Sequence, residues 1–138
     1  MALIFVYGSL RKDMYNYDKF LKDYDSYRYD AYVKGQLYSL KEVTYPALID
    51  GEEMILGEIH EVPEQVLVLL DELESYIDEN HIDNEYDKVI TPIYNKNKEK
   101  IMELPIYKYN IRNQKNKALL DKIIASNDYV QHMKKSRD

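Results

Sequence analysis

Near its start the sequence reads Ala2-Leu3-Ile4-Phe5-Val6-Tyr7-Gly8-Ser9-Leu10, an apolar run followed by a break. The run is rich in strand-favouring residues, which predicts a buried strand, and Gly8-Ser9 should then form a tight loop. Gly8 permits backbone angles at which successive amides point into one concavity, a geometry that binds carboxylates. An ordinary turn, with Gly8 and Ser9 chosen for turn geometry, accounts for the same residues.

Further extended segments are predicted from strand-like composition between turn signals, over residues 27–40, 46–49, 54–62, 86–94 and 100–109. The segments on either side of Asp50-Gly51 should form one hairpin, and those on either side of the polar link 95–98 a second. Short helices are expected over residues 14–24 and 116–125.

A longer helix is predicted to start at Pro63, because a first helical position tolerates a missing amide hydrogen. The apolar residues that follow recur at helical spacing: Val66, Leu67, Leu69, Leu70, Leu73 and Ile77. At about 100° per residue, Glu74 falls inside this apolar arc. Burial disfavours the charged form, so Glu74 should be largely buried with a raised pKa, as suits a general acid or base. A position at the edge of the arc that reaches water, or a structural ion pair, would also explain the pattern.

The order of strands, one central helix and more strands indicates an α+β fold. We expect a small curled or barrel-like mixed β-sheet, with a central helix that carries the candidate catalytic glutamate and with short flanking helices. The chain has 138 residues and shows no linker, repeat or low-complexity stretch. Residues 1–138 are therefore expected to form a single domain.

Composition argues against several classes of function. The chain has no cysteine, which excludes disulfides, thiolate zinc sites and cysteine nucleophiles. Its three histidines are scattered and lack metal-ligand spacing, so neither a metal nor a cofactor is expected. A net charge of −6 argues against a nucleic-acid partner. No apolar window approaches the roughly 18 residues of a membrane span, and the first strand lacks a basic leader, so a cytoplasmic protein is expected.

Two segments together resemble a known family. They are Tyr7-Gly8-Ser9-Leu10-Arg11, with Asn16 shortly after, and Leu70-Asp71-Glu72-Leu73-Glu74-Ser75-Tyr76. They are similar to the signature loop and the glutamate-bearing helix of the γ-glutamylcyclotransferase-like superfamily, which includes γ-glutamylamine cyclotransferases. The resemblance continues in order over nearly the whole chain, through Tyr45-Pro46-Ala47-Leu48-Ile49, Gly57-Glu58-Ile59-His60-Glu61-Val62, Tyr86-Asp87-Lys88, Tyr107-Lys108-Tyr109 and Asn127-Asp128-Tyr129.

The sequence departs from the family pattern at four positions. Asp13 and Ser75 stand where members often carry glycine, Lys88 where they carry arginine, and Tyr129 where they carry tryptophan. None of these changes removes the carboxylate or the loop. Lys88 puts in doubt a bidentate contact, because lysine offers a point charge rather than a planar fork.

The resemblance implies an enzyme, a cyclotransferase of the carbon–nitrogen lyase or acyltransferase type, that converts a γ-glutamyl amide to 5-oxoproline and a free amine. The α-amine of the substrate would attack its own γ-carbonyl, while Glu74, as the catalytic residue, carries the proton from one nitrogen to the other. The resemblance implies substrate binding by five further residues: Tyr7, Gly8, Ser9, Leu10 and Tyr86. Tyr86 and the loop amides are also the candidate donors to the developing oxyanion.

Alternatives remain open within and beyond this class. The leaving amine could be that of a free amino acid, a dipeptide, a lysine side chain or a small polyamine-like group. A non-catalytic binding module of the same fold, recognising a γ-glutamyl or related carboxylate ligand, is the main rival, and the presence of Glu74 disfavours it. A structural protein that associates through its tyrosines is a weaker one. For partners we expect a small-molecule γ-glutamyl substrate, no nucleic acid and no membrane, with the chain a monomer or weak homodimer.

Overall fold

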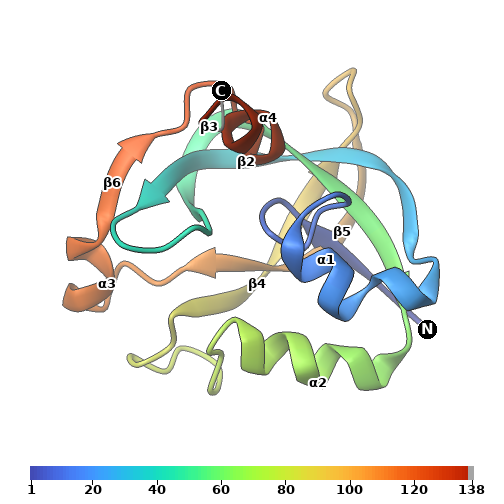
Figure 1. Cartoon of the computed structure of the whole chain (residues 1–138), viewed down its shortest axis with the longest axis horizontal. Helices are drawn as coiled ribbons and strands as arrows, with labels where there is room; N and C mark the ends of the chain where they lie inside the picture. Colours follow the sequence, from blue (N-terminus) through green and yellow to red (C-terminus); the bar gives the residue numbers. More distant parts are fainter. Residues whose placement is uncertain (137–138) are drawn as a thin grey trace.

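The computed structural model describes residues 1–136 and shows short helices around one sheet (Figure 1). In chain order the elements are β1 (Ala2–Val6), α1 (Tyr15–Phe20), the 3-10 helix η1 (Lys22–Tyr24), β2 (Tyr27–Leu40), β3 (Ala47–Val62), α2 (Glu64–Leu73), β4 (Tyr86–Tyr94), β5 (Lys100–Tyr109), α3 (Gln114–Ala118), β6 (Leu120–Ile123) and α4 (Tyr129–Ser136). None of the helices within residues 1–136 is both long and apolar enough to cross a membrane.

Strand β1 is the predicted opening strand, and it packs against apolar side chains on both faces. Successive side chains of a strand point to opposite faces. Ile4 and Val6 accordingly join a cluster with buried residues of α2, whereas Phe5 and Tyr7 join the main core between the strands. The loop after β1 therefore starts from a strand that is held on both sides.

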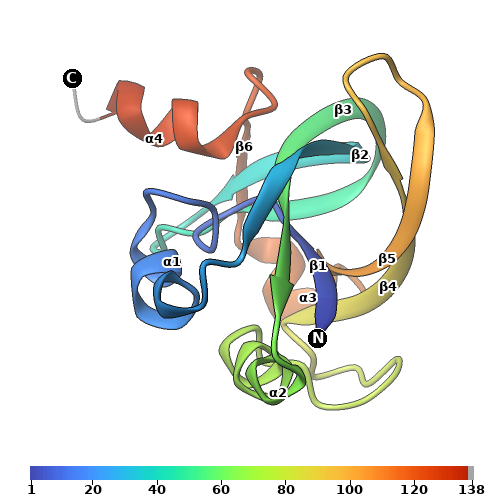
Figure 2. The same cartoon turned by 90° about the vertical axis from the view of Figure 1, so that its right-hand side faces the viewer.

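The sheet is open and antiparallel. Its strand order is β1-β3-β2-β4-β5, with β6 paired to β2, and each of these pairings is antiparallel. Strands β2 and β4 meet only at Tyr32 and Tyr94, so the β4–β5 hairpin curves away from β2 and β3 (Figure 2). The α+β class is confirmed. The sheet is bent but does not close into a barrel, and its pairings are antiparallel rather than mixed.

Strand β3 is continuous, so the hairpin predicted at Asp50-Gly51 is wrong. Both halves of β3 pair with β2 in the same antiparallel sense, and the register slips between Gly35 and Gln36. A Cβ on Gly51 would lie 2.8 Å from the backbone carbon of Gly35. Glycine here permits a bulge with close backbone contact, which resembles a turn signal in the sequence.

The second predicted hairpin is confirmed, because β4 and β5 pair along their length. Its connection is closed by hydrogen bonds from the Asn95 amide to the Glu99 carbonyl (2.9 Å) and from the Lys98 amide to the Asn95 carbonyl (3.0 Å). Tyr86 starts β4, and Tyr107 lies near the end of β5. The hairpin thereby brings these two tyrosines next to the end of α2.

Helix α2 ends four residues before the predicted arc does. Val66 and Leu70 are buried as expected, but Leu69 and Ile77 are exposed, and the helix stops at Leu73. Ser75 takes a left-handed conformation with φ 50°, which reverses the chain. The predicted apolar arc is thus correct for Val66 and Leu70 and wrong for Leu69 and Ile77.

The helix predicted over residues 116–125 is replaced by α3 and then β6. The Asn113 side chain caps α3 by accepting hydrogen bonds from the amides of Lys115 and Asn116. The chain then pairs with β2, where Leu120 lies opposite Leu40 and Ile123 opposite Tyr38. Pairing of residues 120–123 with the edge of β2 outweighs the helical spacing of the apolar residues in this segment.

Candidate active site

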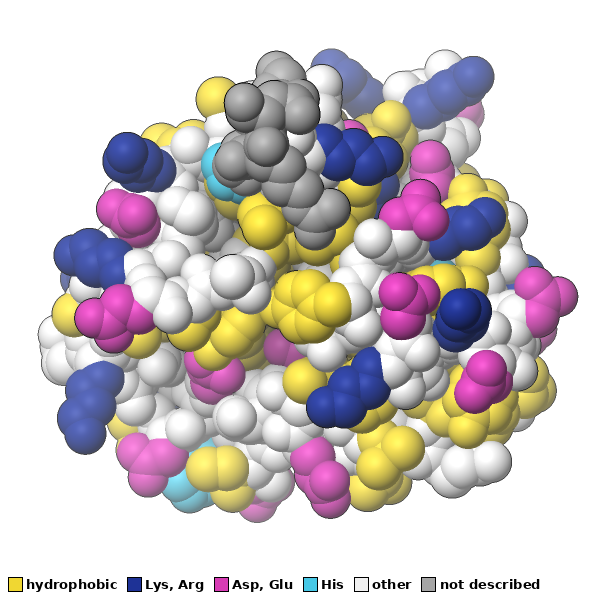
Figure 3. All heavy atoms as spheres, in the orientation of Figure 1, with side chains coloured by type: hydrophobic (Ala, Val, Ile, Leu, Met, Phe, Trp, Pro, Cys, Tyr) yellow, Lys and Arg dark blue, Asp and Glu magenta, His cyan; other side chains and the backbone are white. Residues whose placement is uncertain are grey.

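One cavity brings the six predicted site residues together. It lies between the loop after β1, the β2–β3 connection, the end of α2 and the start of β4, and it holds about 570 Å³ including its open mouth. Its mainly apolar and aromatic lining with a few polar groups is typical of a small-molecule site. Its lining includes Tyr7, Gly8, Ser9, Leu10, Glu74 and Tyr86. On the face shown in Figure 3, acidic side chains lie set back in a hollow above α2.

Gly8 is required by its neighbour rather than by its backbone angles. No glycine among residues 1–136 has a positive φ, so the conformational freedom expected of Gly8 is not used. A Cβ at this position would instead lie 2.9 Å from both Cγ and Cδ of Pro46. The missing side chain lets the β2–β3 connection close over the loop and form one wall of the cavity.

The start of α1 holds the loop after β1. The Ser9 carbonyl accepts hydrogen bonds from the amides of Asn16 (3.1 Å) and Tyr17 (3.2 Å), and the Asn16 side chain donates to Ser9 Oγ (2.7 Å). Within residues 1–136 the amides of Ser9 and Leu10 donate to no protein acceptor. Both residues line the cavity, so these two N–H groups can serve an anionic ligand, most strongly a carboxylate.

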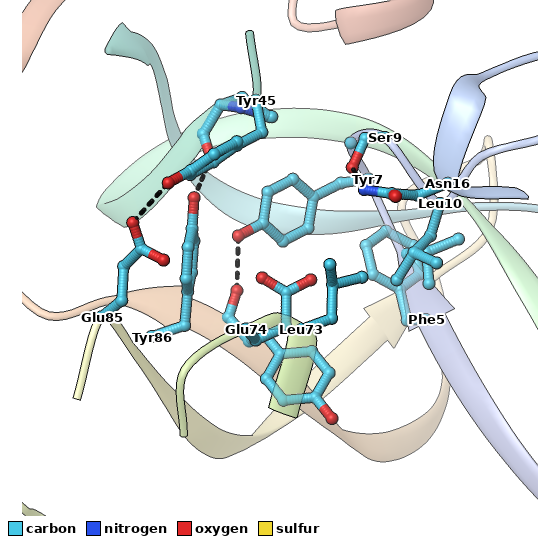
Figure 4. Close-up of a pocket in the computed structure, with 14 residues that line it drawn as sticks. Phe5, Tyr7, Ser9, Leu10, Asn16, Tyr45, Leu73, Glu74, Glu85 and Tyr86 are labelled. Atoms are coloured by element: carbon cyan, nitrogen blue, oxygen red, sulfur yellow. Dashed lines mark hydrogen bonds between the residues drawn. The ribbon is translucent and has the colours of Figure 1, made fainter. Parts of the chain in front are cut away.

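Glu74 enters the cavity because α2 ends beside it. It is the C-cap of the helix, with φ −85° and ψ 4°, and its amide donates to the Leu70 carbonyl (2.9 Å). The side chain is half-buried, and its carboxyl points towards Tyr7 (Figure 4). Burial, followed by the negative charge of Glu85, raises the pKa of Glu74 to about 8. A half-buried carboxyl with this pKa can both take up and release a proton near neutral pH.

The carboxyl of Glu74 has no hydrogen-bond or ion-pair partner among the described residues. Among residues 1–136 it forms neither a salt bridge nor a side-chain hydrogen bond, whereas the carboxylates of Glu58 and Asp71 form both. A structural ion pair therefore does not explain its position. The apolar-arc argument predicted that Glu74 faces inward, and it does line the cavity, but the helix end and not the helix face directs it there.

Tyr7 and Tyr86 form the walls on either side of Glu74. The Tyr7 hydroxyl donates to the Tyr107 carbonyl (2.5 Å), and the Tyr86 hydroxyl donates to the Pro46 carbonyl (2.5 Å). Burial, then the charge of Glu74, raises the pKa of Tyr7, and burial is also the first cause that raises the pKa of Tyr86. Both hydroxyl hydrogens are committed to carbonyls. In this arrangement Tyr86 offers the cavity a ring and an acceptor oxygen, not a donor to an oxyanion.

The end of α2 is anchored by Asp71, one turn before Glu74. Lys88 Nζ lies 2.7 and 3.0 Å from its two carboxylate oxygens, and the Tyr107 hydroxyl donates to it (2.5 Å). The Lys88 ammonium also lies over the rings of Tyr76 and Tyr107, at 5.2 and 5.8 Å from their centroids. Lys88 thus spans both oxygens of Asp71 despite lacking the fork of an arginine, and it ties α2 to β4.

Several residues of the cavity were not predicted as site residues. They are Phe5, Val6, Asn16, Tyr45, Pro46, Leu73, Glu85 and Tyr107. Asn16, Tyr45, Pro46, Leu73 and Tyr107 lie in segments that carried the family resemblance, which was the available signal. Glu85 immediately precedes Tyr86, and nothing in its spacing distinguishes it from the other acidic residues of 78–87. No group of His, Cys, Asp and Glu able to hold a metal ion occurs in the part of the chain that the structure describes.

Sequence comparisons point to one family. Residues 4–131 match a family model described as "Gamma-glutamyl cyclotransferase, AIG2-like". A protein of Halalkalibacterium halodurans that is provisionally named a γ-glutamylcyclotransferase is 48% identical over 63 residues, which cover 44% of this chain and 54% of that protein. The γ-L-glutamyl-butirosin B γ-glutamyl cyclotransferase of Niallia circulans is 33% identical over 89 residues, or 64% of this chain and 56% of that protein. These matches span little more than half the length of either relative.

Solved structures share the fold. An uncharacterised protein of Pyrococcus horikoshii superposes with a TM-score of 0.68 at 20% identity, over 99% of this chain and 97% of that one. An AIG2-like protein of Mus musculus superposes with a TM-score of 0.67 at 22% identity, over 86% of this chain and 84% of that one. At these identities the likeness concerns the fold alone.

Proposed function

The chain belongs to the γ-glutamyl cyclotransferase, AIG2-like family, and on that premise we propose that it converts a γ-glutamyl amide to 5-oxoproline and a free amine. The observation that carries this proposal is the carboxyl of Glu74, with a pKa of about 8 and no partner among the described residues, in a cavity that also presents two amides without a described acceptor. The cavity can hold a substrate carboxylate at one place and move a proton at another.

The loop after β1 binds the α-carboxylate of the substrate. Its donors are the amides of Ser9 and Leu10, and Asn16 holds Ser9 in place through its side chain. The γ-glutamyl chain then folds back along Tyr7, so that its γ-carbonyl lies near Glu74. Holding both ends of the reacting group favours a reaction within one molecule, because the orientation is provided before the bond forms.

Glu74 acts first as a base and then as an acid. It takes a proton from the α-ammonium, and the freed nitrogen attacks the γ-carbonyl carbon to form the new C–N bond of the lactam. The bond from that carbon to the leaving nitrogen breaks, and Glu74 returns its proton to this nitrogen. The attacking nitrogen begins as an ammonium with three hydrogens and ends as a lactam nitrogen with one, so after the attack it loses a second proton, through Glu74 or water, and this proton ends on the released amine. The products are 5-oxoproline and an amine in its ammonium form.

The raised pKa of Glu74 makes the first step feasible. An α-amino group titrates at about 8, whereas an unperturbed glutamate titrates at about 4.3, a mismatch worth about 5 kcal/mol. With the pKa of Glu74 at about 8, donor and acceptor are nearly matched. Efficient general acid–base catalysis needs such a match near the working pH.

A binding module of the same fold is the second candidate function. It would use the loop after β1 and the tyrosine walls to hold a γ-glutamyl or related carboxylate ligand without turnover. The unpaired Glu74 disfavours it, because an uncompensated carboxyl in the cavity costs free energy that a pure binder would avoid with an apolar residue. An assay for 5-oxoproline release distinguishes the cyclotransferase from the binding module.

The first prediction is that Glu74→Gln abolishes 5-oxoproline release while leaving the affinity for 5-oxoproline near that of the wild type. Glutamine keeps the volume of the side chain but cannot carry a proton, so the loss should reach at least about 100-fold in kcat. The assay is chromatographic detection of 5-oxoproline from a panel of γ-glutamyl amides. The matched control is Glu72→Gln, on the exposed side of α2, which should retain activity. Undiminished turnover in Glu74→Gln would contradict the assignment.

A further inference from the structure

The cavity carries a second carboxylate, that of Glu85, for which the proposed reaction has no use. Its Oε2 accepts a hydrogen bond from the Tyr45 hydroxyl (2.6 Å), and its amide donates to the Ser75 carbonyl (3.1 Å). The side chain is half-buried. Among residues 1–136, Oε1 has no hydrogen-bond or ion-pair partner. One oxygen is therefore oriented by Tyr45, while the other remains able to bind a ligand.

The charge around Glu85 favours a cation. Glu74 and Glu85 are the charged residues among those that line the cavity, and none of the described lining residues is Lys, Arg or His. The negative charge of Glu85 is the second cause, after burial, of the raised pKa of Glu74, so the charge of Glu85 acts on Glu74 across the cavity. A positive group beside Glu85 would satisfy its free oxygen and relieve this repulsion.

The arrangement of the cavity assigns Glu85 to the leaving-group end. Figure 4 shows Glu74 between the loop residues Ser9 and Leu10 on one side and the Glu85–Tyr45 pair on the other. Ser9 and Leu10 are buried, whereas Tyr45 and Glu85 are only half-buried, so solvent reaches the cavity wall more easily at Glu85 than at the loop. A γ-glutamyl group bound by its α-carboxylate at the buried end directs its amide substituent towards Glu85.

We propose that Glu85, oriented by Tyr45, binds a positively charged group on the leaving amine, so that the preferred substrates are γ-glutamyl amides of amines that carry a second, cationic nitrogen. This inference rests on the proposed function. It selects one class among the possible leaving groups: diamines and polyamines fit, whereas amines with an apolar or anionic end do not. Glu85 is a specificity-determining residue in this scheme and takes no part in proton transfer.

The same contact would also change the ionisation of Glu74. A cation at Glu85 offsets the charge that helps to keep the pKa of Glu74 high, so more of Glu74 is ionised when such a substrate is bound. The α-ammonium of the substrate is the other cation that could reach Glu85. The two occupants differ in a measurable way, because every γ-glutamyl amide has the α-ammonium and only some have a cation on the leaving side.

The test compares matched pairs of γ-glutamyl amides. One member is the amide of a diaminoalkane, in several chain lengths, and the other is the amide of the alkylamine in which a methyl group replaces the distal ammonium. The amide of an ω-amino acid supplies the anionic case. The wild type should prefer the cationic member by about tenfold or more in kcat/KM at one chain length at least, the usual scale of a charge-assisted hydrogen bond. Equal use of all three classes would overturn the proposal.

Two substitutions test whether Glu85 causes the preference for cationic amides. Glu85→Gln should reduce the cationic-to-neutral ratio of kcat/KM by about tenfold, and Tyr45→Phe should reduce it less, because the carboxylate stays but loses its orientation. The matched control is Glu79→Gln, an exposed charge outside the cavity, which should leave the ratio unchanged. A uniform loss over all amides would place the α-ammonium at Glu85 and overturn the assignment.

Binding measurements test the same preference for cationic amides without turnover. Calorimetric titration of the same pairs into Glu74→Gln, and into Glu74→Gln combined with Glu85→Gln, measures the cationic preference without product formation. A preference in the first protein that disappears in the second supports the inference, and no preference in the first refutes it. Failure of the proposed function has a separate sign: no 5-oxoproline from any amide with the wild type.

Discussion

Glu74 differs from the other buried or half-buried carboxylates in what surrounds it. The pKa of Glu58 is lowered: burial opposes the shift, but hydrogen bonds from His60 and the Lys12 amide and the charge of Arg11 outweigh it. Glu74 has burial without such compensation, and Glu85 adds to the effect. A desolvated carboxyl without donors keeps its proton to a higher pH. This contrast is the physical basis for assigning proton transfer to Glu74 and a structural role to Glu58.

Glu74→Gln should also remove a pH-dependent loss of stability. The native pKa of about 8 exceeds the ordinary value of 4.5, so the native state binds more protons between these pH values, and the wild type loses stability as pH rises through this window. Relative to the wild type, the variant should gain about 1–3 kcal/mol between pH 5 and pH 9. Urea denaturation at each pH measures the difference. Glu72→Gln is the exposed control, and a difference that stays constant with pH would contradict a desolvated Glu74.

Gly8→Ala should weaken ligand binding more than Glu74→Gln does. The added Cβ would lie 2.9 Å from the ring of Pro46, so either the loop after β1 or the β2–β3 connection must shift. Overpacking of this kind costs about 1–3 kcal/mol, which corresponds to about a tenfold or larger loss of affinity if the strain falls on the loop. Calorimetric titration with 5-oxoproline is the measurement. Wild-type affinity in Gly8→Ala would show that the loop does not bind the carboxylate.

At the scale of elements, the site depends on where α2 ends and how it is anchored. Leu73 is its last helical residue, and Ser75 reverses the chain with φ 50°. Asp71 is tied to β4 by Lys88 and to β5 by Tyr107. These contacts hold the last turn of α2 against the hairpin, so the C-cap residue Glu74 projects between the two. The anchored end of α2 therefore fixes the position of the Glu74 side chain.

Ser75→Gly should stabilise the protein. A residue other than glycine pays for a left-handed conformation, and glycine is the usual residue after a helix end. The gain should be about 0.5–1 kcal/mol, because the greater freedom of glycine in the unfolded chain offsets part of the relief. Thermal and urea unfolding measure it. Ser75→Ala is the matched control and should bring no gain, since alanine keeps the Cβ; equal stability of both variants would contradict the explanation.

At the scale of the whole molecule, Arg11 links the loop after β1 to distant parts of the chain. Its Nε lies 3.1 Å from Glu58 Oε2 in β3, and its Nη1 lies 2.7 Å from Asp128 Oδ1, just before α4. Glu58 also accepts hydrogen bonds from the Lys12 amide (2.8 Å) and contacts His60 Nε2 (2.9 Å). This network of charged side chains therefore holds the loop after β1 in place on the side that faces away from the cavity.

Arg11→Met should destabilise the protein strongly, by about 3–5 kcal/mol, because it leaves the buried carboxylate of Glu58 and the partly buried one of Asp128 without their cation. The matched control is Arg28→Met, since Arg28 forms an ion pair with Glu61 in which both side chains are more than a third exposed. Surface pairs of this kind contribute about 0–1 kcal/mol. Urea denaturation of the two variants gives the comparison. Equal losses would show that the Arg11 network is not a significant source of stability.

The local sequence was sufficient for features that depend on neighbours along the chain. The strands over 27–40, 86–94 and 100–109 follow from β-favouring runs between polar turns, and the turn after β1 follows from Gly8-Ser9. The family followed from ordered segments spread over the chain. These segments contain Glu74 and all five residues predicted to line the site with it, although the periodicity of α2 misjudged how Glu74 reaches the cavity.

Tertiary structure alone decided what depends on distant partners. The continuity of β3, the pairing of β6 with β2 and the open sheet are set by hydrogen bonds between segments far apart in sequence, which local propensity does not encode. The same holds for Glu85: it joins the cavity because the chain folds back from Ser75 to start β4 beside Tyr45. A charge acquires its role from the side chains that surround it in space, and those come together only in the folded chain.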